Sequence, residues 1–242
     1  MGGRRILGEE RVGNLLMQDP ILITGVARSG TSMTAGIISL CGAVGGNVCG
    51  ATKANKRGQF ENVEMRNTLI KPYLTSMGLD PRGQNPLPED LSSLLPFPDF
   101  GRKMKEIARA QGIAKDVAWY FKGAKLCLIW PVVAATLPGS KWVVVRRSDA
   151  GIINSCIYTG FMNAYKTAPG WKKWVDIHRR HISSMEDFLG DTCREVWPER
   201  FINGDFSEIS GVIDWLGLNW NFEQVSKFIA PELWGESKWH KG

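Results

Sequence analysis

Short apolar runs alternate along the chain with segments of helical spacing. Apolar runs predict strands at 21–23, 125–129, 142–145 and 201–202. The run at 142–145 is the strongest, because a continuous β-branched stretch is typical of a strand buried on both faces of a parallel sheet. Helical spacing predicts helices at 32–41, 60–77, 102–111, 207–216 and 222–229. Strands alternating with helices predict one α/β domain in three layers, a central parallel sheet flanked by helices.

The predicted domain covers residues 1–242, with a polar N-terminal arm at 1–18 and a flexible tail at 235–242. The segment 81–101 is rich in proline and has little periodicity, so we expect an irregular loop, either a lid beside a site or plain surface. No repeat or low-complexity block divides the chain. Nothing in the pattern therefore calls for a second domain.

Composition narrows the class of protein. The 242 residues are 43% hydrophobic and 22% charged, which is typical of a globular protein and excludes disorder and coiled coil. The five cysteines are odd in number and form no CxxC pair, so neither a disulfide framework nor a zinc site is indicated. A reducing compartment fits such cysteines, and no signal sequence or membrane span is evident. We expect a cytoplasmic protein.

Positive charge gathers in one part of the chain. The formal net charge is +6, and the segment 122–181 alone contains 10 basic and 2 acidic residues. Such an excess fits an anionic partner, which could be nucleic acid, an anionic surface or a phosphorylated ligand. The net charge does not distinguish these three kinds of partner, so the distinction depends on sequence motifs.

The first such motif follows the predicted strand at 21–23. Residues 25–32 read G-V-A-R-S-G-T-S, which is the G-x-x-x-x-G-x-[ST] spacing of a phosphate loop between a strand and a helix. Two glycines let successive N–H groups converge on an anion, and the helix adds the positive end of its dipole. A plain glycine turn is the alternative. With this loop, the predicted fold is of the P-loop type.

One position in this loop separates two functions. Nucleoside triphosphatases carry a Lys between the second Gly and the Ser, and this chain has Thr31 there, while its cation is Arg28. Cleavage at a γ-phosphate is therefore poorly supported, although a P-loop kinase or other nucleotide phosphotransferase stays open as an alternative.

A second anion motif follows the predicted strand at 142–145. Arg147 is separated by eight residues from Ser155, and the pattern from Asp149 onward is mostly helical, which predicts that Ser155 lies in the helix after this strand. A guanidinium recognises phosphate through its planar fork, and a helix-borne hydroxyl donates one more hydrogen bond. Arg146 would place Asn154 at the matching position, so Arg147 is the preferred residue.

Together these motifs resemble those of the sulfotransferase family, most closely its bacterial type. Arg28, Ser29, Gly30, Thr31 and Ser32 are similar to the family's loop for the 5′-phosphosulfate of 3′-phosphoadenosine-5′-phosphosulfate (PAPS), and the Arg147–Ser155 pair is similar to its 3′-phosphate site. Residues 55–62 resemble the family's Asn-Pro-Lys-Gly-x-Phe-Glu segment, and 122–127 its Lys-Asp-Pro-Arg-x-Cys segment. The resemblance runs from about residue 20 to 160, with weaker agreement to about 233.

The resemblance implies a sulfotransferase that uses PAPS as co-substrate, releases 3′-phosphoadenosine-5′-phosphate (PAP) and requires no metal. Animal cytosolic members carry a catalytic His where this chain has Ala124, so the base must lie elsewhere. Related enzymes without the His use a Glu, which here implies Glu61, with Glu64 as the second choice. Lys122 would stabilise charge on the sulfonate, and Arg28 would hold the 5′-phosphate and the bridging oxygen.

The sequence does not define the acceptor or the oligomeric state. The acceptor is a small molecule or glycan of undefined class, we expect no nucleic-acid partner and no membrane span, and the oligomeric state is undetermined. Departures from the family segments, namely Lys56 for Pro and residues 123–125 for Asp-Pro-Arg, keep a further alternative: a nucleotide- or polyanion-binding module that has lost catalysis.

Overall fold

The computed structural model describes residues 17–52 and 55–234. Its four strands are β1 (Ile21–Thr24), β2 (Tyr120–Lys122), β3 (Trp142–Val145) and β4 (Cys193–Val196). They form one parallel sheet in the order β2-β1-β3-β4. Ile23 of β1 pairs with Lys122 on one side and with Val143 on the other. The carboxyl ends of β2, β1 and β3 therefore meet at one edge of the sheet.

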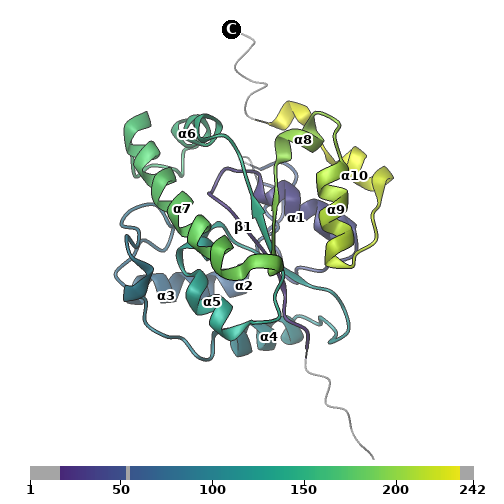
Figure 1. Ribbon diagram of the computed structural model, residues 1–242, viewed down its shortest axis with the longest axis horizontal. Coiled ribbons are helices and arrows are strands. Elements are labelled where there is room, and N and C mark those ends of the chain that lie inside the picture. The colour runs from purple at the N-terminus through teal and green to yellow at the C-terminus, as the bar shows by residue number, and fades with distance from the viewer. Residues whose placement is uncertain (1–16, 53–54, 235–242) are drawn as a thin grey trace, which may run out of the picture.

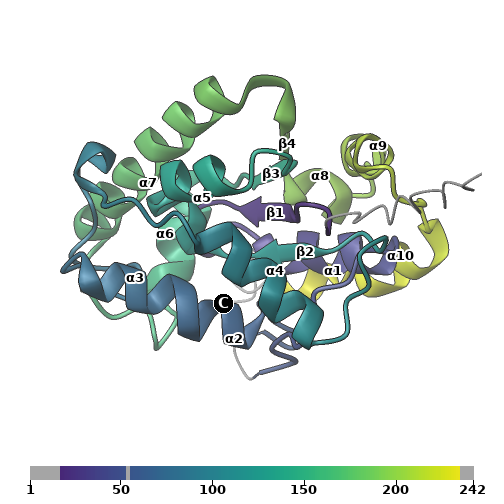
Figure 2. The same cartoon turned by 90° about the horizontal axis from the view of Figure 1, so that it is seen from below.

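Helices cover both faces of this sheet (Figures 1 and 2). They include α1 (Thr31–Leu40), α4 (Phe100–Ala110), α5 (Trp130–Thr136), α6 (Asp149–Ile157), α7 (Ala168–Leu189), α8 (Pro198–Ile202), α9 (Ser207–Leu216) and α10 (Phe222–Phe228). One helical stretch is divided into α2 (Val63–Met65), the π-type segment η1 (Arg66–Ile70) and α3 (Lys71–Ser76). Short 3₁₀ turns are η2 (Leu91–Ser93), η3 (Ala124–Leu128), η4 (Gly190–Thr192) and η5 (Pro231–Leu233).

The strand residues divide between two cores. Leu22 and Val144 belong to the core on the side of α4, α5 and α7, while Ile23 and Val143 belong to the core with α1, α9 and α10. Successive strand side chains point to opposite faces, so each apolar strand supplies both cores. The two helical layers lie on either side of β1 in Figure 1. The predicted three-layer α/β fold with a central parallel sheet is confirmed.

The strand predicted at 125–129 is wrong. Residues 125–128 lie in η3, and the strand of this region, which pairs with β1, is β2, a few residues earlier. Leu126, Cys127, Leu128 and Ile129 are all fully buried, so their apolar run is real, but a buried 3₁₀ turn gives the same pattern as a buried strand. The N–H of Leu126 donates to the carbonyl of Gly123, which closes the turn directly after β2.

The strand predicted at 201–202 is also wrong. These residues lie in α8, which begins at Pro198, a residue whose fixed φ suits the first turn of a helix. The strand of this region is β4, whose two central residues are exposed, and it has no apolar run by which sequence could reveal it. It is the last strand in the sheet order, where only one side is paired.

The remaining predictions fall partly outside the structure. Residues 1–16 of the expected arm and all of the expected tail at 235–242 lie outside the described residues. The proline-rich segment is irregular, as expected, apart from η2 and the first two residues of α4. Within the described ranges, no helix has the length and apolar character needed to cross a bilayer.

Candidate functional site

The loop between β1 and α1 is built around two glycines. A Cβ at Gly25 would lie 2.4 Å from the carbonyl oxygen of Val145, so only glycine lets β1 pass this close to the end of β3. Gly30 has φ 100° and caps α1, and a Cβ there would lie 2.9 Å from Pro198. Arg28 has a left-handed φ of 75°. This conformation is uncommon for a residue with a side chain and marks a tightly turned loop.

The groups inside this loop fit an anion. The N–H groups of Thr31 and Ser32 open α1, where a helix offers no internal acceptor for them. The hydroxyl of Ser29 is fully buried and has no hydrogen-bond partner among the described residues. The N–H of Ser29 instead donates to the carbonyl of Val26 at 3.0 Å, so it does not join the N–H groups expected to hold phosphate. The Ser32 hydroxyl donates to the carbonyl of Gln59 at 3.1 Å.

The two motifs found in sequence meet in space through Arg28. Its Nε donates to Oγ of Ser155 at 3.0 Å, and Nη1 of Arg147 donates to the backbone carbonyl of Arg28, also at 3.0 Å. Ser155 lies in α6, and Arg147 follows β3, with only 4% of its surface exposed. The expected 5′-phosphate and 3′-phosphate sites therefore form one hydrogen-bonded group at the carboxyl edge of the sheet.

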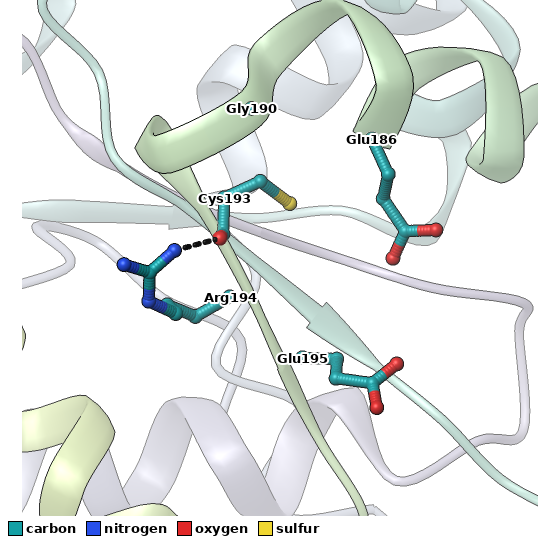
Figure 3. A pocket seen from close by; sticks show the side chains of 5 residues that line it. All are labelled: Glu186, Gly190, Cys193, Arg194 and Glu195. Carbon is teal, nitrogen blue, oxygen red and sulfur yellow. Dashed lines mark hydrogen bonds between the residues drawn. The ribbon is translucent and has the colours of Figure 1, made fainter.

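Arg146, the neighbour of Arg147, has a different role. Its Nη2 lies 2.5 Å from Glu186 in α7, and its Nε lies 3.1 Å from Glu195 in β4. Both acids line a pocket with Gly190, Cys193 and Arg194 (Figure 3). These ion pairs account for the charge of Arg146 and leave Arg147 as the arginine that faces the loop.

Lys122 ends β2 beside this loop. It pairs in register with Ile23, and the hydroxyl of Thr24 donates to the carbonyl of Gly123 at 3.1 Å. Lys122 is buried, and this burial lowers its pKa, while the charge of Glu61 acts in the opposite direction. A buried ammonium group is costly without anions nearby, so this position suits a negatively charged ligand.

Glu61 lies among cations. Its Oε1 lies 3.4 Å from Nζ of Lys125, and its Oε2 lies 3.5 Å from Nη1 of Arg66. Burial by itself raises the pKa of Glu61, but Lys125, Lys122 and Arg66 outweigh it and hold the pKa below its ordinary value. The side chain is therefore an ionised carboxylate at neutral pH.

The backbone around Glu61 is held by its neighbours. Phe60 has a left-handed φ of 54°. The side chain of Asn62 caps α2 by accepting from the N–H of Met65 at 3.1 Å and donates to the carbonyl of Gly45 at 2.9 Å. Asn62 is fully buried, so these bonds fix where the chain enters the helix and hence where Glu61 points. Glu64, the second choice for a base, is exposed and accepts from Gln111.

We expect Lys125→Met to raise the pKa of Glu61, because it removes the nearest of the cations that lower this pKa. The effect of burial, which raises the pKa, is then less compensated. A depressed carboxyl pKa stabilises the fold above the ordinary pKa of Glu, and this contribution is lost as the pH falls through the folded-state value. In Lys125→Met this stabilisation of the fold therefore begins to be lost at a higher pH than in the wild type. Magnetic resonance titration of side-chain carboxyl carbons measures the shift, with the exposed lysine in Lys56→Met as the control. An unchanged midpoint for Glu61 would contradict the ion pair.

The structure adds residues that the sequence did not single out. Arg66 lies only five residues after Glu61, and this short separation could have suggested their contact. Trp234 lies against Arg147, and no local pattern in the sequence points to that contact. His178 and His181 are buried in α7, where His178 Nδ1 donates to the backbone carbonyl of Trp174 and His181 Nε2 donates to that of Pro88, so both serve helix packing. Burial lowers the pKa of His178 to about 4.

The class of fold that carries this site is found among known structures. The chain is similar to the sulfotransferase domain from the Synechococcus PCC 7002 olefin synthase, with a TM-score of 0.53 and 13% identity, over 91% of this chain and 81% of that one. It is also similar to sulfotransferase STF9 from Mycobacterium avium, with a TM-score of 0.50 and 10% identity, over 88% of this chain and 67% of that one. At such identities the likeness establishes the fold.

Sequence comparison alone detects no such relationship. A scan against protein-family models finds no match, and a search of curated proteins finds no significant one. The fold expected from the motifs is thus confirmed by structural comparison.

Proposed function

We propose that this protein is a sulfotransferase that moves a sulfonate group from PAPS to a hydroxyl or amine acceptor. The observation that carries the proposal is the contact of Arg28 with both Ser155 and Arg147. Two anion-binding motifs far apart in sequence form one site, which suits a nucleotide with phosphates at two positions. The fold shared with sulfotransferases supports the same function.

The loop holds the 5′ end of the donor. The N–H groups of Thr31 and Ser32 and the orphaned hydroxyl of Ser29 line the turn, and Arg28 adds a charged donor. Gly25 and Gly30 keep the backbone close enough for these donors to converge. We assign these residues to the 5′-phosphosulfate, with Arg28 at the phosphate and the bridging oxygen.

Arg147 and Ser155 hold the 3′-phosphate. Arg147 presents a planar guanidinium fork that matches phosphate oxygens, and Ser155 uses its lone pair for Arg28, which leaves its O–H to donate. Because Arg28 contacts both residues, occupancy of one phosphate site positions the other.

The chemistry needs a base and stabilisation of charge. Bound PAPS supplies an activated sulfonate, whose transfer forms a bond from the acceptor oxygen to sulfur and breaks the bond from sulfur to the bridging oxygen. Glu61, ionised among its cations, takes the acceptor proton. Lys122 stabilises charge on the sulfonate, and Arg28 stabilises the electron pair left on the departing phosphate. The leaving group is PAP.

A comparison of two nucleotides tests the donor. We expect PAP to raise the melting temperature, since a ligand at about a hundred times its Kd stabilises the folded state by about 2.7 kcal/mol. We expect ATP with Mg²⁺ to have little effect, because Thr31 replaces the lysine that binds γ-phosphate. Turnover is then measured with labelled PAPS over a panel of hydroxyl and amine acceptors.

Two results would contradict the proposal. Stabilisation by ATP with Mg²⁺ and none by PAP would favour a phosphotransferase. Binding to nucleic acid with a steep salt dependence, and none to PAP, would favour a polyanion-binding module without catalysis.

A further inference from the structure

Trp234 lies where the two halves of the proposed donor site meet. It directly follows η5, and its N–H donates to the carbonyl of Pro231 at 3.0 Å. The guanidinium carbon of Arg147 lies 4.1 Å from the centroid of its indole ring. This is the shortest of the cation-to-ring distances among the described residues, and it is the distance of a stacked pair.

The same indole reaches the phosphate loop. A Cβ at Gly30 would lie 3.0 Å from Cη2 of Trp234, which is tighter than most contacts of real Cβ atoms. One side chain near the C-terminal end of the described chain therefore touches the residue that caps α1 and also covers the arginine assigned to the 3′-phosphate. Both contacts lie in the site, although η5 supplies none of the motif residues.

Stacking controls the guanidinium without using its donors. The N–H groups of arginine lie in the plane of the group, and its flat faces are weakly hydrated. An indole on one face therefore restrains the orientation of the plane and uses none of the N–H donors along its edge. Nη1 of Arg147 is fixed by the carbonyl of Arg28, so two contacts together define the direction of the fork.

We infer that Trp234 is a positioning residue for donor binding, acting by holding the guanidinium of Arg147 in the plane that the 3′-phosphate requires. The inference rests on the proposed function, since it needs PAP to bind at Arg147. It assigns a role to a residue outside both anion motifs.

Affinity for PAP tests the role, by calorimetry on the full chain. We expect Trp234→Ala to weaken binding about tenfold, the worth of a partly desolvated cation–π contact, and Trp234→Phe to restore most of it. With PAPS as substrate, the KM for donor rises and kcat changes little. Trp215 in α9 is the matched control, because it lies over Lys141 and Arg194, neither of which belongs to the site. Trp215→Ala should bind PAP as the wild type does.

A double-mutant cycle separates positioning from general support of the fold. If Trp234 acts through Arg147, Trp234→Ala costs affinity in the wild type and nothing further in an Arg147→Ala background. An equal cost in both backgrounds, or wild-type affinity in Trp234→Ala, would overturn the inference while leaving the proposed function intact. Failure of the wild type to bind PAP at all would overturn the proposed function and the inference with it.

Discussion

Replacing Arg147 by alanine is expected to weaken binding of PAP by about a hundredfold to a thousandfold, because a fork of charge-assisted hydrogen bonds to phosphate is lost. The guanidinium is almost fully buried and lies beside the loop that holds Arg28. Water therefore cannot easily replace it as a phosphate ligand. The measurement is the dissociation constant of PAP by calorimetry, accompanied by the melting temperature of the variant.

The adjacent arginine provides the control for this experiment. Arg146→Ala removes the same side chain one position earlier, but Arg146 is paired with Glu186 and Glu195 away from the loop. Its affinity for PAP should stay near that of the wild type. Arg147→Lys should be intermediate, since lysine keeps the charge and lacks the fork. Equal affinities of the wild type and Arg147→Ala would remove this residue from the site.

Glu61→Gln is expected to leave PAP binding nearly unchanged and to reduce turnover by about a hundredfold to ten-thousandfold, the usual worth of a general base. The amide matches the carboxylate in shape but cannot take a proton. It also leaves Lys125 and Arg66 without their negative partner, so the melting temperature should fall. Turnover of labelled PAPS and affinity for PAP are measured on the same sample.

Glu64→Gln is the matched control, since Glu64 lies one helical turn away and is exposed. Loss of turnover in Glu64→Gln with retention in Glu61→Gln would move the base to Glu64. Retention in both variants would place the base outside this segment. Glu61→Asp, which keeps the charge on a shorter side chain, separates loss of the base from loss of the ion pairs.

The strands show what pattern alone can and cannot predict. The β3 run was predicted because burial on both faces demands apolar residues at successive positions. The same reasoning failed at 125–129, since a buried 3₁₀ turn is equally apolar, and it could not find β4, whose central residues face solvent. Local hydrophobicity therefore indicates that a segment is buried. Whether the buried segment forms a strand or a turn depends on whether a neighbouring strand pairs with it.

The electrostatic surroundings of Glu61 show a second limit. Its place at the start of a helix follows from the sequence pattern, and the resemblance to sulfotransferases, with Ala124 where animal members have a His, implied Glu61 as the base. The ion pair with Lys125 could not be predicted, because Glu61 and Lys125 are distant in sequence. They meet only because η3 follows β2 beside the loop. The direction of the pKa shift therefore depends on tertiary contacts, since burial and the cations act in opposite senses.

The sequence by itself determined the strand–loop–helix with the spacing of a phosphate loop, the arginine and serine eight residues apart, and the α/β class of the fold. Each of these depends on short-range spacing, which backbone geometry converts directly into local structure. Only the tertiary structure decided that Arg28 joins the two motifs, that Glu61 is held ionised, and that Trp234 covers Arg147. These contacts join segments far apart in the chain, and packing of the two helical layers on the sheet is what brings them together.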